Sequence, residues 1–336
     1  MQLIKFAKYQ PGEVARFAVR LFADCSTDPL PTVWANYPVE AFGLIKQLKR
    51  GADFNLFERP FADQIKARDF SCALVGFSGG KDSTAAALKL RAKGFNPILF
   101  HVKGINQSYP GERRAAEKVA VAIGAKLIVL DLKLSGKSAY FENPAKNQVI
   151  LGFMVDYGRQ KGIANYAQGG ANEDSCADLN FVAGYSDGRE MYQAADKVFQ
   201  AALDGYRFWH GLLENDTDSL LTLLSYAPGV LQVMQSCMMP VRYKGNLTKG
   251  NENKYGVKLL PGRCGSCYKC ASEWLHLALS NFVPWSDSFA LHSMNILNKG
   301  LQVVRGAGVY SFDDLMTMFF DLNRLPAAAK LRKFAP

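Results

Sequence analysis

Phe77-Ser78-Gly79-Gly80-Lys81-Asp82-Ser83 is the most informative stretch of the sequence, because of the elements expected on either side of it. The apolar residues 71–77 predict a buried strand, and the Ala- and Leu-rich residues 84–93 predict a helix. Two glycines let the backbone turn tightly and bring its N–H groups onto an anion, to which the helix N-terminus adds partial positive charge. The stretch therefore predicts a phosphate-binding loop, although it lacks the Gly-x4-Gly-Lys-Ser/Thr pattern of a Walker A loop.

Strand and helix patterns alternate through the rest of the central region. The expected strands are 96–101, 126–131 and 162–168, and the expected helices are 112–123, 147–160 and 189–203. Such alternation is typical of βαβ units, which build a parallel sheet with helices packed against it. We therefore expect an α/β fold with a doubly wound parallel sheet.

A group of cysteines follows this region. Cys264, Cys267 and Cys270 form a C-x2-C-x2-C pattern, whose spacing lets ligands from one short loop reach a single tetrahedral ion. A structural site needs a fourth ligand, for which Cys237 is the leading candidate and His276 the second. Zinc is the expected metal. An iron–sulfur cluster is the alternative, because three thiolates with one open position also suit it.

The length and composition are those of a globular protein. The chain has 336 residues, of which 49% are hydrophobic and 21% charged, and this excludes a disordered or fibrous chain. The expected parts are an N-terminal helical extension at 1–70, the α/β domain at 71–235, a cysteine subdomain at 236–280 and a C-terminal helical extension at 281–336. No long apolar run or signal-peptide pattern is visible, so we expect a cytoplasmic protein with no membrane association.

The formal net charge of +10 favours phosphate-bearing partners. Positive charge is densest in a basic arm, defined as residues 242–263, which has six Lys or Arg residues and a single Glu. The basic residues are Arg242, Lys244, Lys249, Lys254, Lys258 and Arg263. We expect the arm either to bind nucleic acid or an acidic protein, or to be a solvated loop that supports the cysteine site.

The motif SGGKDS at 78–83 resembles the signature of the PP-loop ATP pyrophosphatases. In that superfamily ATP is cleaved between its α and β phosphates, and a substrate oxygen becomes adenylated. The resemblance implies that ATP and Mg²⁺ bind at this loop, that Asp82 positions Mg²⁺ or the loop itself, and that His101 lies near the adenosine. It implies catalytic roles for Ser78, Lys81, Asp82 and Ser83. A buried core position remains the alternative for His101.

Within that superfamily, the order of motifs over about residues 71–278 resembles the 7-cyano-7-deazaguanine synthase (QueC) family. The matching passages are the phosphate loop, Pro144-Ala-Lys146-Asn147, Gly169-Gly-Ala-Asn172-Glu-Asp174, Tyr185-Ser-Asp187-Gly-Arg189 and the four cysteines. The resemblance implies that the nucleotide and a purine-like substrate contact Lys146, Asn147, Gly169, Asn172, Asp174, Tyr185, Asp187 and Arg189. Asn172 and Asp187 could hydrogen-bond a guanine-like base, or could belong to a solvated turn.

The resemblance implies an ATP-dependent ligase that adenylates the carboxylate of 7-carboxy-7-deazaguanine, releases pyrophosphate and uses ammonia to form an amide and then a nitrile. A carboxylate oxygen becomes a leaving group only after it is esterified to AMP. Formation of that ester releases pyrophosphate, and the loop must stabilise the charge on it. One alternative is an enzyme of a phage-defence or DNA-modification system that attaches the activated deazapurine to a protein or nucleic acid. Another is a tRNA sulfurtransferase, with Cys176 as its candidate nucleophile. A homodimer is one of the oligomeric states that the sequence allows.

Overall fold

The computed structural model describes residues 4–6, 69–103, 111–131, 150, 153–155, 157–158, 161–169, 207–209, 212–213, 215–235, 237, 239, 241–305 and 320–334. The chain divides into two compact units. The first unit is built from residues 1–77, 86–107 and 124–212, and the second from 78–85, 108–123 and 213–336. None of the described helices is long and apolar enough to cross a lipid bilayer.

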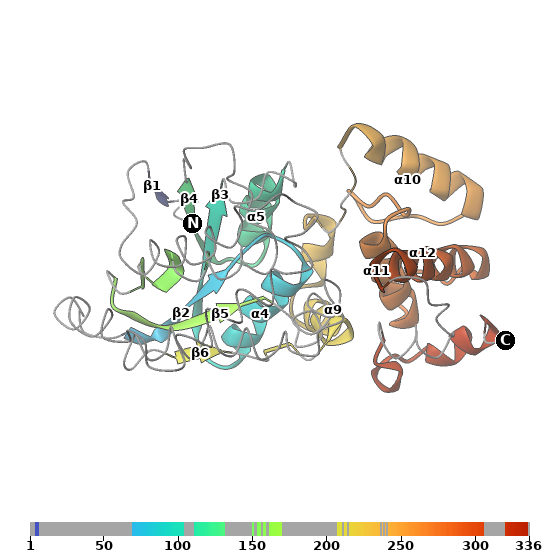
Figure 1. Ribbon diagram of the computed structural model, residues 1–336. Coiled ribbons are helices and arrows are strands. Elements are labelled where there is room, and N and C mark those ends of the chain that lie inside the picture. The colour runs from blue at the N-terminus through green and yellow to red at the C-terminus, as the bar shows by residue number, and fades with distance from the viewer. Residues whose placement is uncertain are drawn as a thin grey trace. The chain divides into compact units, whose positions relative to one another are not determined.

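The first unit contains a six-stranded sheet in which every pair of neighbouring strands is parallel (Figure 1). Its strands are β1 (Ile4–Phe6), β2 (Asp69–Gly76), β3 (Asn96–Lys103), β4 (Lys126–Asp131), β5 (Ile163–Gln168) and β6 (Arg207–Trp209). Their order is β1-β4-β3-β2-β5-β6, so the chain adds β3 and β4 on one side of β2 and then β5 and β6 on the other. The predicted α/β fold with a parallel sheet is confirmed.

The apolar run at 71–77 forms most of β2, in which Ala73, Leu74 and Val75 have no exposed surface. A strand in the middle of a parallel sheet is covered on both faces, and it therefore reads as a continuous apolar run. The winding direction of the sheet reverses beside β2. Ligands of open α/β sheets bind outside the carboxyl ends of the strands at such a reversal, and the predicted phosphate loop directly follows β2.

The sheet begins earlier in the chain than we expected. The segment Ile4–Phe6 pairs in parallel with β4, with Lys5 opposite Val129. The prediction that residues 1–70 all precede the first sheet strand was therefore wrong for this segment. Three residues are too few to show the alternating pattern by which a strand is recognised. The helices expected in this extension lie outside the described residues.

The helices of the central region are α4 (Lys81–Ala92) and α5 (Glu112–Ala122). The later elements are α9 (Asp216–Tyr226), η3 (Pro228–Gln232), α10 (Val241–Tyr255), α11 (Tyr268–Leu279), α12 (Asp287–Arg305), η4 (Leu322–Arg324) and η5 (Ala328–Phe334). The helix predicted at 147–160 is helical at those of its residues that are described, and the one predicted at 189–203 lies outside them. Two expectations changed here: α4 begins three residues before the predicted start at 84, and the basic arm contains a helix, α10.

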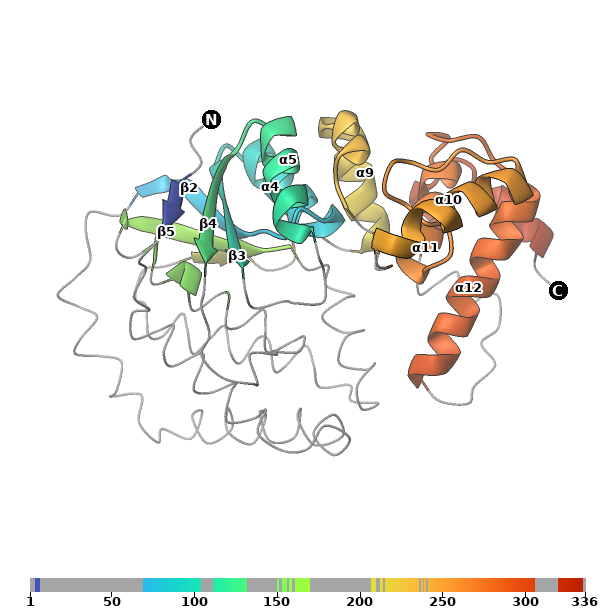
Figure 2. The same ribbon diagram turned by 90° about the horizontal axis from the view of Figure 1, so that it is seen from above.

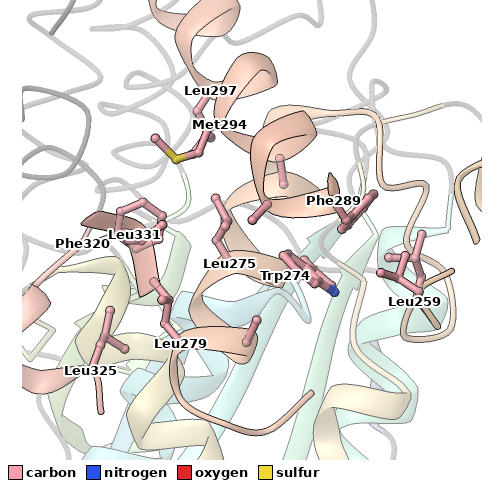
Figure 3. Close-up of a cluster of buried hydrophobic side chains, with 14 residues drawn as sticks. Leu259, Trp274, Leu275, Leu279, Phe289, Met294, Leu297, Phe320, Leu325 and Leu331 are labelled. Carbon is pink, nitrogen blue, oxygen red and sulfur yellow. The ribbon is translucent and has the colours of Figure 1, made fainter. Parts of the chain in front are cut away.

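An apolar core holds the C-terminal part of the second unit together. In this core α11 packs against α12 (Figure 2). The Trp274 and Phe289 rings meet edge to face at a centroid distance of 4.7 Å, and Phe320 and Leu331 from the end of the chain join the same cluster (Figure 3). Side chains from both sides of the domain boundary predicted at 280 share this core, so the boundary does not separate two independent cores.

Candidate functional site

The phosphate loop turns directly into α4. The Gly80 carbonyl oxygen accepts hydrogen bonds from the Thr84 backbone N–H at 3.2 Å and from Thr84 Oγ1 at 2.6 Å, so Gly80 is the residue that caps the helix. The first N–H groups of any helix lack an acceptor within the helix. Those of Asp82 and Ser83 can therefore donate to an anion.

Two serine hydroxyls meet in the loop. Ser78 Oγ lies 3.3 Å from Ser83 Oγ and accepts a hydrogen bond of the same length from the Gly80 N–H. Ser78 is exposed, whereas Ser83 is buried. The structure thus brings both predicted hydroxyls to one side of the turn, where an exposed Ser78 can reach a ligand and a buried Ser83 supports it.

The two glycines of the loop have different roles. Gly79 has a φ of +77°, and a Cβ atom added there would lie 2.5 Å from the backbone nitrogen of Ala116 in α5. Gly79 is therefore required by its left-handed conformation and by close packing against a helix backbone. A Cβ on Gly80 would meet nothing nearer than Ser78 Oγ at 3.3 Å. The sequence alone did not separate these two roles, because the packing partner is 37 residues away in the chain.

Lys81, for which a catalytic role was predicted, forms an ion pair with Asp216 and lies 3.3 Å from Asp82 Oδ1. Asp216 is the first residue of α9, and sequence reasoning missed it because nothing in its local pattern distinguishes it from an ordinary helix start. Burial alone would raise the pKa of Asp216. The positive charges of Lys81, His276 and Lys269 outweigh that effect and hold the pKa below its usual value.

Asp82 has the features of a cation ligand. Its Oδ1 atom is buried and accepts no hydrogen bond from the described residues, although Lys81 lies nearby. Carboxylate oxygens are the protein ligands that Mg²⁺ prefers. This oxygen, which pairs with the Lys81 ammonium but accepts no hydrogen bond from the part of the chain described, is compatible with either predicted role of Asp82, holding Mg²⁺ or positioning the loop.

His101, predicted to lie near the adenosine, is buried at the end of β3, with 4% of its surface exposed. Its Nδ1 atom is hydrogen-bonded to the carbonyl oxygen of Phe77 at 2.9 Å. The Phe77 N–H in turn donates to the Phe100 carbonyl at 2.9 Å. This arrangement supports the alternative reading of His101 as a core histidine, which here anchors the residue that leads into the phosphate loop.

Of the predicted substrate-pocket residues, the structure describes Gly169. It directly follows β5, whose Gln168 pairs with Gly76 of β2, so Gly169 and Phe77 leave the sheet at the same edge. Gly169, the first residue of the 169–174 passage, therefore follows the strand next to the one that leads into the phosphate loop. The remaining predicted contacts lie outside the described residues: Lys146, Asn147, Asn172, Asp174, Tyr185, Asp187 and Arg189.

The four predicted cysteines form one cluster. The Sγ atoms of Cys237, Cys264, Cys267 and Cys270 all lie within 4.8 Å of one another, and those of Cys264 and Cys270 are 3.9 Å apart. A tetrahedral zinc ion with Zn–S bonds of about 2.3 Å places its sulfur ligands about 3.8 Å apart. The cluster can therefore hold a metal such as zinc, and sulfur atoms this close favour a single ion over the iron–sulfur alternative.

His276, the second candidate for the fourth ligand, has other partners. Its Nε2 atom lies 3.0 Å from Thr217 Oγ1, and its Nδ1 atom lies 2.8 Å from the Ser272 carbonyl oxygen. Thr217 Oγ1 also accepts a hydrogen bond from the Asp321 N–H at 3.0 Å. Through Thr217 the His276 ring joins α11 to the start of α9, and it is not part of the cysteine cluster.

The ionisation of the thiols is consistent with a cation site. Hydrogen bonds from the other three thiols lower the pKa of Cys237. The pKa values of Cys264 and Cys270 are raised, first of all by their hydrogen bonds with Cys237. One thiolate is stabilised at this spacing, and further negative charges repel it. A divalent metal ion removes that repulsion and allows all four groups to deprotonate.

Residues around the cluster fix its backbone. Asn251 Nδ2 donates to the Cys264 carbonyl at 2.8 Å and to Ser266 Oγ at 2.7 Å, and the Ser266 N–H donates to Cys264 Sγ at 3.3 Å. Gly265 between them has a φ of +67°. These bonds hold Cys264 in place and give its sulfur an N–H donor that stabilises the thiolate.

The prediction that the basic residues of the arm serve a partner or belong to a solvated loop was wrong for Arg263. Its guanidinium is buried and forms two hydrogen bonds to the Glu273 carboxylate, of 3.1 and 2.6 Å, while Nη1 donates to the Met234 carbonyl at 2.8 Å. Burial alone would lower the pKa of Arg263, but Glu273 more than offsets this and raises it. Arg263 therefore ties together the segments that carry Cys237, Cys264 and Cys270, and it does not serve an external partner.

Among the side chains of the arm that the structure describes, the exposed positive charges are those of lysines. Lys249 and Lys254 are exposed on α10, and Lys258 is exposed just after it. The Lys254 ammonium lies 5.0 Å from the centre of the Tyr255 ring. Glu252, the one acidic residue of the arm, accepts a hydrogen bond from the Leu259 N–H at 2.9 Å and so closes the turn after the helix.

Comparison with known proteins assigns no family. No family model matches the chain, and a search of curated proteins found no match. Among solved structures, the chain is similar to one described as a "predicted subunit of tRNA methyltransferase from Methanocaldococcus jannaschii". The two share 22% identity at a TM-score of 0.29, over 46% of this chain and 75% of that one. A similarity at this level indicates neither a family nor an activity.

Proposed function

We propose that the protein is an ATP-dependent, QueC-like ligase that adenylates the carboxylate of 7-carboxy-7-deazaguanine and uses ammonia to convert it to the amide and the nitrile. The observation that carries the proposal is the loop at 78–83: a tight glycine turn, two serine hydroxyls and a helix N-terminus directly follow the strand where the sheet winding reverses. A downstream four-cysteine cluster in the order expected of that family supports it.

The proposed reaction assigns a task to each part of the loop. A substrate carboxylate oxygen attacks the α-phosphorus of ATP, the bond from that phosphorus to the oxygen bridging to the β-phosphate breaks, and pyrophosphate leaves. The Asp82 and Ser83 N–H groups, the Ser78 hydroxyl and the Lys81 ammonium stabilise the charge that gathers on pyrophosphate. Ammonia then displaces AMP, and its nitrogen becomes the amide nitrogen. The nitrile requires a second ATP: the amide oxygen attacks its α-phosphorus, pyrophosphate leaves, and the oxygen then departs with AMP while the nitrogen loses two protons. Mg²⁺ held by Asp82 would neutralise further charge on the departing group.

The decisive experiment is product analysis. The purified protein is incubated with ATP, Mg²⁺, ammonia and 7-carboxy-7-deazaguanine, and the small molecules are identified by mass spectrometry. The nitrile together with AMP and pyrophosphate is the expected result. AMP and pyrophosphate without amide or nitrile would indicate a different acceptor, and no AMP with any of these components would overturn the proposal.

Removal of a loop side chain tests the same site. Ser78→Ala and Asp82→Ala are each expected to lower the rate of AMP formation by about 10²–10³, because the first removes a hydrogen-bond donor to the departing pyrophosphate and the second removes the carboxylate proposed to hold Mg²⁺. The melting temperature should change little, since Ser78 is exposed and Asp82 is half-buried. Ser71→Ala, an exposed serine at the other end of β2, is the matched control and should keep full activity. Full AMP formation in both loop variants would remove the loop from the mechanism.

A second candidate function keeps the adenylation step but transfers the activated deazapurine to a macromolecule. The observation that favours it is the set of exposed lysines on and after α10: Lys249, Lys254 and Lys258. Each contact between a lysine and a nucleic-acid phosphate releases counterions, so binding through this surface should weaken steeply as salt rises. A polyanionic acceptor would thereby be held close to the enzyme.

Charge reversal distinguishes these two functions. Changing Lys249, Lys254 and Lys258 to Glu is expected to abolish RNA or DNA binding at low salt while AMP formation on small substrates is unchanged. Reversal of Lys93, Lys118 and Lys126, which are exposed elsewhere, alters the net charge equally and should leave that binding largely intact. If the unaltered protein does not bind nucleic acid at low salt, the nucleic-acid acceptor is excluded, which leaves an acidic protein or no macromolecule.

Sulfur transfer, the third alternative, needs an ionised cysteine near the loop. Its candidate, Cys176, lies outside the described residues. Among the described cysteines outside the cluster, Cys72 lies near the start of β2, and burial together with Asp69 raises its pKa. Cys72 is therefore not activated as a nucleophile.

A further inference from the structure

The ion pair between Lys81 and Asp216 joins two helix starts that are distant in the sequence. Lys81 is the first residue of α4 and belongs to the phosphate loop, whereas Asp216 is the first residue of α9, 135 positions later. Both side chains are mostly buried, with 15% and 26% of their surfaces exposed. An ion pair in such surroundings is less screened than one at the surface.

The Lys81 ammonium lies between two carboxylates. Asp216 contacts it directly, and Asp82 Oδ1 lies 3.3 Å away. The local charge on these three side chains is therefore negative, although the loop has the backbone features of an anion site. A phosphate group that enters the loop must compete with Asp216 for Lys81.

Asp216 is held more firmly than Lys81. Asn215 caps α9 by accepting the Asp218 N–H at 2.8 Å, and Asp218 is bound by Arg324 at 3.0 Å. Thr217, between the two aspartates, is hydrogen-bonded to His276 and Asp321. The backbone that carries Asp216 is therefore fixed from several sides, while Lys81 has four flexible side-chain bonds. Exchange of partners requires movement of Lys81 alone.

We infer that Asp216 is a positioning residue of the phosphate loop: it holds the Lys81 ammonium beside the loop in the absence of ligand and releases it to the phosphates when they bind. This inference rests on the proposed function, because it assumes that phosphates occupy the loop. Asp216 thereby sets a threshold for binding. A polyphosphate carries enough charge to displace a single carboxylate, and a weakly charged anion does not.

Pyrophosphate binding measured by calorimetry tests the inference without any need for turnover. Asp216→Asn is expected to tighten pyrophosphate binding about five- to tenfold, because Lys81 no longer has to leave a charged partner. Asp216→Glu restores the charge and should bring the affinity back toward that of the unaltered protein. Asp287→Asn removes the same charge from an exposed ion pair with Lys333 and should not tighten binding.

A double-mutant cycle distinguishes two effects of Asp216 on phosphate binding: competition for Lys81, and direct repulsion between the Asp216 carboxylate and the phosphates. If Asp216 acts through Lys81, the gain from Asp216→Asn must be larger with Lys81 present than in a Lys81→Met background. Lys81→Gln replaces the Met variant if the latter does not fold. Equal gains in the two backgrounds, or no gain at all, would overturn the inference while leaving the proposed function intact. If the unaltered protein binds neither ATP nor pyrophosphate, the proposed function and the inference both fail.

Discussion

Cys270→Ser is expected to release the metal and to lower the melting temperature by more than about 10 °C. The Cys270 side chain is buried with 1% of its surface exposed, and its sulfur lies among three other sulfurs within 4.8 Å. Structural zinc contributes roughly 10–16 kcal/mol to the folding of zinc-finger peptides, which is comparable with the total stability of a domain. The cysteine region therefore should not keep its fold without the metal.

Elemental analysis and thermal melts measure this effect. One zinc per chain is expected for the unaltered protein, and close to none for the Cys270 variant. Cys72→Ser is the matched control, because Cys72 is a half-buried cysteine outside the cluster and its replacement should leave the zinc content unchanged. Iron in place of zinc, or full zinc content in the Cys270 variant, would contradict the assignment.

Gly79→Ala should abolish ATP and pyrophosphate binding. The added Cβ would lie 2.5 Å from the Ala116 nitrogen and 2.8 Å from the Ala115 carbonyl carbon, and both are backbone atoms of a helix that cannot move aside cheaply. The positive φ of Gly79 adds roughly 1–2 kcal/mol of strain for any other residue. The loop must therefore leave α5, which moves its N–H groups away from the anion.

Two other glycines serve as controls for this experiment. Gly94 has a φ of +88° but open space around its Cβ position, so Gly94→Ala measures the conformational strain alone and should keep normal pyrophosphate affinity. Gly80→Ala adds a methyl group at the mouth of the loop with no backbone clash, so the protein should fold normally and bind pyrophosphate more weakly. Normal pyrophosphate binding by the Gly79 variant would show that the loop does not need its packing against α5.

Several parts of the site could be predicted from sequence because they are local. The predicted phosphate loop consists of consecutive residues, and the strand and the helix expected on either side of it are present as β2 and α4. The strand at 126–131 was predicted to the residue, because its apolar run is bounded by Gly124 and by polar residues. The C-x2-C-x2-C pattern likewise indicates three ligands by spacing alone.

Other features depend on residues that meet only in the folded chain. The sequence left Cys237 and His276 as competing fourth ligands, and packing separated them by placing His276 against Thr217. The sequence placed Arg263 among the charges of the basic arm, whereas in the structure it is buried and paired with Glu273. An amino-acid pattern carries no signal of which distant side chain will neutralise a buried charge, because many pairings satisfy the same local rules.

The alternation of strands and helices, the glycine turn and the cysteine spacing are properties of short segments, and backbone geometry and hydrophobic periodicity suffice to predict them. The pairing of Lys81 with Asp216, the contact that makes Gly79 obligatory and the parallel pairing of β1 with β4 all join segments that are distant along the chain. These contacts arise because burial of the apolar strands and helices brings distant segments together, and the charges and glycines at their ends must then fit whatever lies opposite.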